Sequence, residues 1–267
     1  MNKLETMIQK YLSAEDAKKI SAAKRQFIAL ELTDDKTTNI CSKVGGVGYL
    51  PKSVKYPTNT DGKPLSFLAQ INFAEMPKLS PFPEQGILAF YIDIFDDLMG
   101  LNLDDPKDHS GYQVFYFADS SEPSQDLTGI FEPYKNEELY EVVENEKRLS
   151  GTLSEIIPMG DFVEFTQSVG KDFYGMMEDN LSDQQIDDLM DMVPIESAIG
   201  GYPFFTQTDP REYDQGLANN YNTLLFQLVS DDDNVMWGDS GVANFFINQE
   251  KLQNLDFSDV MYNWDCY

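Results

Sequence analysis

Basic residues are scarce in this chain of 267 residues, in which 19 lysines and arginines stand against 46 aspartates and glutamates. The formal net charge is −27 at pH 7, and the only arginines are Arg25, Arg148 and Arg211. Nucleic acids and anionic membranes are bound through clustered Lys and Arg side chains. The composition therefore excludes both as expected partners. A surface of this sign favours cations or a basic protein instead.

Histidine and cysteine are also nearly absent. The one histidine, His109, stands in the polar stretch DDPKDHSGY, and the two cysteines are Cys41 and Cys266. Zinc and iron sites need several His or Cys ligands, and no serine lies in the G-x-S-x-G pattern of a nucleophile elbow. These absences argue against a zinc or iron centre and against nucleophilic catalysis of that kind. The cysteines are expected to stay thiols in a reducing compartment.

Long apolar runs are missing as well. The N-terminal stretch MNKLETMIQKYLSAEDAKKI is charged and lacks the apolar core of a signal peptide, and nowhere do about 18 apolar residues follow one another. We therefore expect a cytoplasmic protein. Hydrophobic residues make up 42% of the chain and aromatic residues 13%. This composition predicts a folded globule despite the high charge.

Short aromatic segments separated by turn residues dominate the last three quarters of the chain. Such segments are typical of antiparallel strands. The predicted strands are LSFLAQI, ILAFYIDIF, YQVFYFA, DFVEFTQ, TLLFQLV, VANFFI and VMYNW. Apolar residues at helical spacing indicate N-terminal helices within residues 1–26, followed by a short strand at 27–32. The sequence predicts an α+β fold in a single domain over residues 1–267.

One further helix is predicted with a strongly acidic side. In SDQQIDDLMDMV, residues 182–193, Ser182 and Gln185 can form a capping box. The apolar residues of this segment fall on one stripe, and aspartates occupy the other face. This acidic amphipathic helix lies within a stretch, residues 174–239, in which fourteen acids stand against the single base Arg211.

The chain also contains a weak internal repeat. A Gly-Gly pair, a strand with a glutamine and an aromatic strand after a glycine each occur twice, at offsets of 155, 157 and 155 residues. The matched features are Gly45-Gly46 with Gly200-Gly201, Gln70 with Gln227, and GILAFYID (86–93) with GVANFFIN (241–248). A common offset indicates a duplicated antiparallel β core. Its units are expected at about 40–120 and 195–267, with 121–194 connecting them.

The two glutamines are candidate site residues because each interrupts an apolar strand at the same repeat position. A buried amide must be hydrogen-bonded. We expect Gln70 and Gln227 to be buried and to hydrogen-bond either the backbone of the Gly-Gly loops or each other. Ligand binding by these amides is the alternative.

The stretch SDDDNVMWGDSGVANFFI, residues 230–247, carries the densest cluster of acids. It fails as an EF-hand, because a loop that starts at Asp231 has valine and methionine where ligands and glycine are needed. A looser Ca²⁺ or Mg²⁺ site on Asp231, Asp233 and Asp239 is possible, since hard cations tolerate varied oxygen spacing. The favoured interpretation is a solvated turn between two strands, with Trp237 packed back on the sheet.

A second tryptophan is expected to lie beside this turn. Trp264 and Asp265 end the last predicted strand, and consecutive strands usually neighbour each other in an antiparallel sheet. We therefore expect Trp264 to contact Trp237. Asp239 and Asp265 are then expected to accept backbone hydrogen bonds, with cation binding as the alternative.

The segments GGVGYLP, PLSFLAQINFAEMP, EQGILAFYID, LLFQLVSDDDNVMWGDSGVANFFI and DFSDVMYNWDCY resemble the YwqG-like family, a group of bacterial proteins of unknown function. The resemblance covers most of the chain, and MWGDSG and YNWDC are its most specific parts. It implies an α+β fold and brings no established activity. The proline usual in the first Gly-Gly loop comes later here, at Pro51.

Two classes of function follow from these observations. The preferred hypothesis is a protein-binding or regulatory module, of the immunity or inhibitor kind, that captures a basic protein by electrostatic steering and needs no cofactor. The alternative is a hydrolase assisted by Ca²⁺ or Mg²⁺ on Asp231, Asp233, Asp239 or Asp265.

Overall fold

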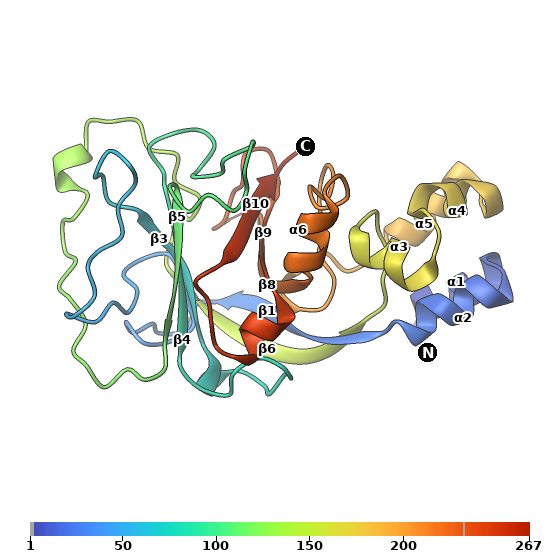
Figure 1. Cartoon of the computed structure of the whole chain (residues 1–267), viewed down its shortest axis with the longest axis horizontal. Coiled ribbons are helices and arrows are strands. Elements are labelled where there is room, and N and C mark those ends of the chain that lie inside the picture. The colour runs from blue at the N-terminus through green and yellow to red at the C-terminus, as the bar shows by residue number, and fades with distance from the viewer. Residues whose placement is uncertain (1–2, 232) are drawn as a thin grey trace.

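A computed structural model describes residues 3–231 and 233–267 of the chain. Its described residues form a mixed α+β fold, in which an antiparallel sheet of ten strands curls on itself and a group of helices extends from one end (Figure 1). None of the described helices is long and apolar enough to cross a membrane.

The order of strands divides the sheet into two similar wings. The strands, from edge to edge, are β10 (Val260–Asp265), β9 (Val242–Ile247), β8 (Thr223–Val229), β7 (Ser197–Gly200), β1 (Arg25–Thr33), β6 (Lys147–Ile156), β2 (Lys43–Val44), β3 (Ser66–Asn72), β4 (Ile87–Ile92) and β5 (Tyr112–Phe117). We call β2–β5 the first wing and β7–β10 the second wing. The long strands β1 and β6 lie between them and pair antiparallel over nine residues of β1.

The wings face each other across the main core. The ring of Phe90 in β4 lies 4.7 Å from the ring of Phe226 in β8 and 4.7 Å from that of Phe245 in β9. The edge strands β5 and β10 also approach, because the hydroxyl of Tyr112 donates to the carbonyl of Val260 at 2.6 Å. Aromatic side chains at alternate strand positions therefore close the sheet almost into a barrel.

Helices gather mainly at one end of the molecule. The helical lobe, drawn in blue and yellow at the right of Figure 1, consists of α1 (Lys3–Tyr11), α2 (Ala14–Ala22), α3 (Val163–Val169), α4 (Phe173–Asn180) and α5 (Asp183–Met190). Its apolar stripes enclose a second hydrophobic core. The short helices α6 (Gln215–Asn220) and α7 (Gln249–Gln253) lie beside the second wing, and single 3₁₀ turns occur at Phe73–Glu75 (η1) and Glu132–Tyr134 (η2).

The acidic amphipathic helix is confirmed as α5. The side chain of Ser182 and that of Gln185 form the expected capping box at its start. Leu189 is buried against the lobe, while Asp187 and Asp188 are exposed. The capping residues and the apolar stripe were both readable from the sequence because they act within one helix.

One predicted strand is wrong, and three observed strands, β2, β6 and β7, were not predicted. Residues 161–167 were expected to be extended, but they enter α3, in which Phe162, Phe165 and Val169 are buried at helical spacing. Gly170 ends this helix in the left-handed region at φ 76°. The stretch 121–194, expected as a connection, also contributes β6, whose side chains are mostly polar or exposed. Its place in the centre of the sheet comes from pairing with β1.

The two wings share their pairing register in detail. In the first wing the β3–β4 pairing shifts between Phe67 and Ala69, and in the second wing the β8–β9 pairing shifts between Leu224 and Phe226. After the irregularity, each glutamine strand continues in register with its aromatic partner strand. The segments GILAFYID and GVANFFIN thus occupy matching strands, β4 and β9.

Candidate functional site

The aspartate-rich turn is held by its first carboxylate. Oδ1 of Asp231 accepts the backbone N–H of Asn234 at 2.5 Å and that of Val235 at 2.9 Å. Partial burial alone would raise the pKa of Asp231, but these hydrogen bonds outweigh it and hold that pKa below its usual value. Asp231 therefore shapes the connection between β8 and β9, as a turn residue does.

Two further carboxylates of this turn, those of Asp233 and Asp239, lie at the surface. Asp233 and Asp239 are exposed, and neither side chain accepts a hydrogen bond from any residue that the structure describes. The expectation that Asp239 accepts backbone hydrogen bonds is wrong, since only its main-chain carbonyl does so, from Tyr267 at 3.2 Å. Within residues 3–231 and 233–267, no three His, Cys, Asp or Glu side chains are grouped so as to hold a metal ion.

The two tryptophans meet as expected. The rings of Trp237 and Trp264 lie 6.0 Å apart, and Trp237 is fully buried. Trp264 donates its indole N–H to the carbonyl of Leu98 at 2.6 Å. Gly241 permits this packing, because a methyl group there would lie 2.0 Å from the carbonyl oxygen of Asp265. The pair anchors the C-terminal strand to the turn.

Asp265 accepts backbone hydrogen bonds, as was expected of both Asp239 and Asp265. Its Oδ1 accepts from the backbone N–H of Thr206 at 3.0 Å and from the hydroxyl of Thr206 at 2.8 Å. Its Oδ2 accepts the N–H of Gln207 at 3.1 Å. The carboxylate thereby ties the loop after β7 to the end of β10, and this contact is structural.

Asp265→Ala is expected to lower the free energy of unfolding by about 1–3 kcal/mol, because it leaves partly buried N–H groups without an acceptor. Asp239→Ala is expected to change it by less than about 0.5 kcal/mol, as is usual for exposed sites. Urea denaturation with and without Ca²⁺ measures both variants. Equal losses in the two variants would show that Asp239 has a structural partner after all.

The two glutamines are buried and hydrogen-bonded, as predicted. Oε1 of Gln70 accepts the N–H of Tyr49 at 2.7 Å, and Oε1 of Gln227 accepts the N–H of Phe204 at 2.7 Å. The Nε2 groups donate to carbonyls just before β2 and β7, at 2.7 Å and 2.8 Å. Each amide therefore fixes the chain on both sides of its Gly-Gly pair. Ligand binding is not needed to satisfy them.

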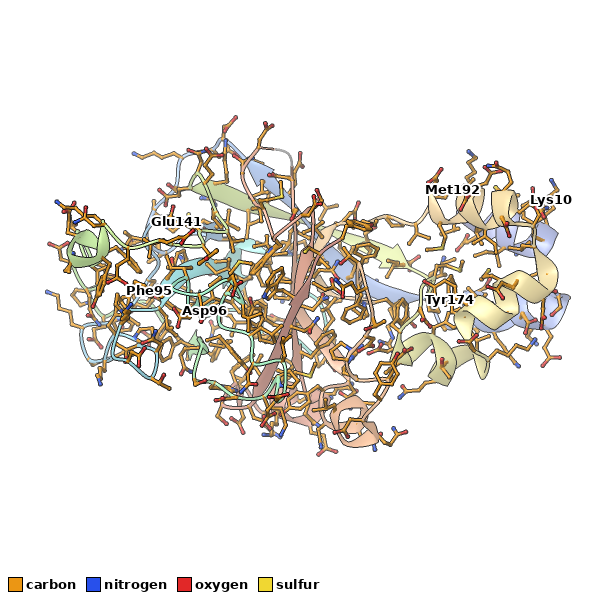
Figure 2. All side chains as sticks on the ribbon, turned by 90° about the horizontal axis from the view of Figure 1, so that it is seen from above. Lys10, Phe95, Asp96, Glu141, Tyr174 and Met192 are labelled. Carbon is orange, nitrogen blue, oxygen red and sulfur yellow. The ribbon has the colours of Figure 1, made fainter. Side chains whose placement is uncertain are left out.

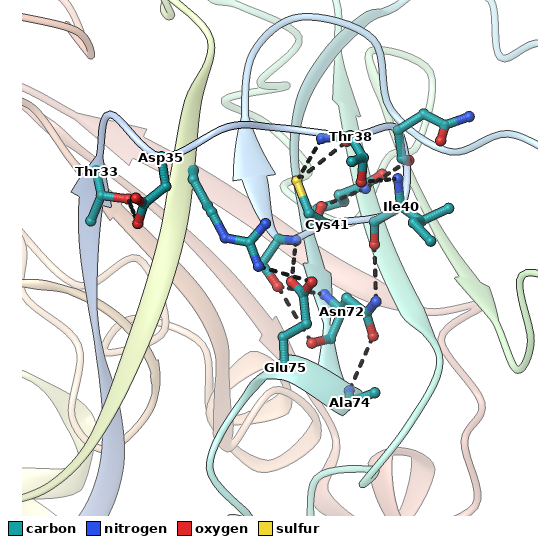
Figure 3. Close-up of polar contacts among 12 residues, drawn as sticks. Thr33, Asp35, Thr38, Ile40, Cys41, Asn72, Ala74 and Glu75 are labelled. Atoms are coloured by element: carbon teal, nitrogen blue, oxygen red, sulfur yellow. Dashed lines mark hydrogen bonds and ion pairs between the residues drawn. The ribbon is translucent and has the colours of Figure 1, made fainter.

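The two thiols lie in different surroundings. Cys41 is buried, and Figure 3 shows its sulfur against Thr38, whose N–H lies 3.2 Å and whose carbonyl oxygen lies 3.3 Å from Sγ. The adjoining backbone is held by Asn72, which donates to the carbonyl of Ile40, and by Glu75, which accepts the N–H of Ser42. Cys266 is half-buried and packs against Gly238.

A cleft of about 570 Å³ lies beside the first Gly-Gly pair, and we call it the first cleft. Its walls come from residues 45–48, from the start of β3 and the end of β4, and from the segment 127–144. Its surface is about equally polar and apolar: Tyr56, Phe67 and Phe131 are among the aromatic side chains that line it, and the exposed Glu141 and Glu144 line it as well. This size and lining are those of small-ligand or side-chain binding sites.

Glycines bring the backbone close to charged and aromatic groups at this wall. A methyl group on Gly46 would lie 2.5–2.9 Å from the carboxyl atoms of Glu146, and one on Gly48 would lie 2.2 Å from the ring of Phe67. Glu146 in turn accepts from the ammonium of Lys43, which is 2% exposed, at 2.5 Å. The glycine-rich sequence is therefore required by close packing as well as by backbone conformation.

Glu141, which lines the first cleft, belongs to a group of acids that we call the acidic end of the molecule, formed by Asp96, Asp97, Glu137, Glu138 and Glu141. Figure 2 shows Asp96, Phe95 and Glu141 together at the end opposite the helical lobe, which carries Lys10, Tyr174 and Met192. The carboxylates act on one another and on Tyr140. Burial, with Asp93 and Asp97 adding to it, raises the pKa of Asp96, and Glu138 raises the pKa of Tyr140.

A further carboxylate with a shifted pKa lies beside the helical lobe. Burial raises the pKa of Glu212 to about 7, and the neighbouring charges of Asp161, Asp209 and Asp172 add to this shift. The pKa of Asp161 is raised by the same causes. Glu212 follows Arg211, which is wholly buried and bonded to Asp209 and to Glu164.

Folding stability is expected to fall as the pH rises from about 5 to about 8, because folded Glu212 holds a proton that the unfolded chain releases at lower pH. The Glu212 carboxyl is only partly buried and the residue remains in contact with solvent. Solvent screening therefore limits the change in unfolding free energy to about 1 kcal/mol. Glu212→Gln is expected to remove this part of the pH dependence. Denaturant titrations across that range measure it, and an unchanged slope in the variant would contradict the assignment.

Sequence reasoning missed the first cleft because its walls come from segments that are far apart in the chain. Two signals were present: the glycines at 45, 46 and 48, of which the first two were noted only as part of the repeat, and the acids that follow β4. Neither signal indicates a cavity until the sheet brings residues 45–48 and 127–144 together.

Comparison with known proteins places the chain in a family without a known activity. No curated protein matches the sequence. Residues 42–266, which include every strand except β1, match the family described as a domain of unknown function, DUF1963. The chain belongs to this family.

Proposed function

We propose that this chain is a protein-binding or regulatory module, of the immunity or inhibitor kind, that holds a basic protein at its acidic end. The observation that carries the proposal is an unbalanced charge. From Asp93 to Glu144 the sequence has fourteen acids and two lysines. Both lysines already pair with acids of this segment, Lys107 with Asp105 at 3.1 Å and Lys135 with Glu132 at 3.2 Å.

An acidic surface of this kind serves association in two ways. It steers a basic partner toward the correct face and so raises the association rate. The first cleft adds apolar surface beside the carboxylates, and burial of that surface provides affinity that salt does not screen. A partner held by both contributions is released only in part at high salt.

The test compares two variants that remove the same charge from opposite ends of the molecule. One carries Asp97→Asn, Glu138→Gln and Glu141→Gln at the acidic end. The control carries Asp187→Asn, Asp188→Asn and Asp191→Asn on α5, all exposed. Each ion pair formed by an exposed carboxylate contributes up to about 1 kcal/mol, so the first variant should bind an oligolysine about tenfold more weakly.

Calorimetric titration of the oligolysine at low and moderate salt gives the three affinities. The control is expected to stay within about twofold of the unmodified protein, because its changes lie more than a screening length from the acidic end. Equal weakening in both variants would show binding through net charge alone, and the proposal would fail. The cation-assisted hydrolase remains a prediction from the sequence, which no contact among the described residues favours.

We also propose that the wings arose by duplication and that the chain falls within the YwqG-like group. The matching register irregularities and the matching glutamine contacts support the first statement. The segments MWGDSG and YNWDC support the second. In each wing the glutamine and the Gly-Gly pair keep their relative positions.

A further inference from the structure

We propose that the first cleft receives a lysine side chain of the basic partner, with its ammonium between the carboxylates of Glu141 and Glu144. This inference rests on the proposed function and specifies the group that enters the site. The aliphatic part of a lysine is apolar and its end is a point charge. A matching site needs apolar walls and an acidic rim.

The first cleft has apolar walls of the right kind. Phe67 lines it from β3, Phe131 and Val143 line it from the segment 127–144, and the glycines at 45, 46 and 48 leave the backbone wall without side chains. Methylene groups gain free energy by leaving water at such a surface. The ring of Phe67 is fixed in place because it lies directly against Gly48.

The rim supplies carboxylates that have no cation of their own. Glu141 and Glu144 line the cleft and are exposed, and neither side chain forms an ion pair with any residue in the described part of the chain. The remaining acid at the rim, Glu132, is paired with Lys135. The negative charge at the rim therefore exceeds the positive charge by two.

The chain already binds one of its own ammonium groups in this way next to the cleft. Nζ of Lys63 lies 4.5 Å from the centre of the Phe95 ring and 2.6 Å from a carboxylate oxygen of Glu137. Phe95 stacks on Phe131 at 6.3 Å, and Phe131 lines the cleft. An aromatic ring and a carboxylate, those of Phe95 and Glu137, thus hold the Lys63 ammonium. The neighbouring cleft also combines an aromatic ring, that of Phe131, with carboxylates.

The second wing shows that the fold itself does not require this charge. A cleft of about 340 Å³ lies beside Gly200 and Gly201, as the first cleft lies beside Gly45 and Gly46. The residues described around it include Arg25 and no acid. The cleft beside the second Gly-Gly pair therefore lacks the acidic lining found beside the first. A Gly-Gly pair thus does not by itself impose an acidic lining, although acids also line a third cleft, through Glu31, Glu196 and Asp231.

Glycine-selective isotope labelling tests the inference directly, with hexylammonium as the probe and hexanol as the uncharged control. Titration with hexylammonium should give saturable NMR shifts of the amides of Gly45, Gly46 and Gly48. The amides of Gly200 and Gly201 report on the second cleft and should not move. Hexanol should bind at least about tenfold more weakly, because it lacks the charge.

The variant that carries Glu141→Gln and Glu144→Gln should lose about tenfold in hexylammonium affinity, whereas Asp187→Asn with Asp191→Asn should lose none. Equal binding of hexanol, or the absence of shifts at Gly45 to Gly48, would overturn the inference. If an oligolysine still discriminates between the two ends of the molecule in that case, the proposed function stands without it. If the amine binds but the oligolysine does not discriminate, the proposed function fails while the cleft assignment holds.

Discussion

Replacing Arg211 with methionine is expected to lower the free energy of unfolding by about 3–5 kcal/mol, the largest effect of any single change considered for this protein. Arg211 is wholly buried, and its guanidinium donates to both oxygens of Glu164 at 2.8 Å and 2.9 Å. It also donates to both oxygens of Asp209 at 2.9 Å and 2.7 Å. Without it, two buried carboxylates face each other unpaired.

Urea denaturation of Arg211→Met measures the loss. Adding Glu164→Gln and Asp209→Asn to the same protein should restore part of the stability, because the buried charges are then removed together. Arg211→Met alone should also gain stability as the pH falls from about 7 to about 5, since unpaired buried carboxylates take up protons. A loss below about 1 kcal/mol would mean that water already reaches this group.

Gln70→Leu is expected to cost about 3 kcal/mol, because it leaves the N–H of Tyr49 and the carbonyl of Cys41 buried without partners. Gln227→Leu removes the corresponding contacts with Phe204 and Glu196 and should cost a similar amount. Gln26→Leu, at an exposed position on β1, is the control and should stay within about 0.5 kcal/mol.

Thermal and urea denaturation of the three variants tests whether the two glutamines contribute equally to the free energy of unfolding. The comparison is informative because burial and hydrogen-bond lengths at the two positions are closely matched. A large loss for only one of the two variants would contradict equivalent roles. If neither variant loses stability, water must hydrogen-bond the backbone groups that the glutamine side chain has left without a partner.

The aromatic strands and α5 could be predicted because each is specified by its own residues, whereas β2, β6 and β7 carry no such signal. Aromatic segments such as ILAFYI and VANFFI have a composition that favours strands wherever they lie, and they form β4 and β9. The segment DFVEFTQ has a similar composition but becomes α3, because its buried rings face the helical lobe at helical spacing. Local preference was overruled there by tertiary packing.

The candidate site was harder to predict than the fold. Gln70 and Gln227 were identified because each is a polar residue inside an apolar strand. This signal is contained in a single short segment of the sequence. Asp239 and Asp265 looked equivalent in the sequence, yet only Asp265 meets donors, which come from Thr206 and Gln207 in a distant loop. The first cleft depends on three separate segments, so no single stretch of sequence contains its signal.

The most direct test of the central claim is to locate a basic ligand on the surface. An oligolysine that carries a photoreactive group is bound at low salt and irradiated, and the labelled peptides are identified by mass spectrometry. The account predicts labelling of the acidic end and of the first-cleft walls, within residues 45–48 and 93–144. Labelling concentrated on α4 and α5, whose acids are as exposed but lie at the opposite end of the molecule, would contradict it.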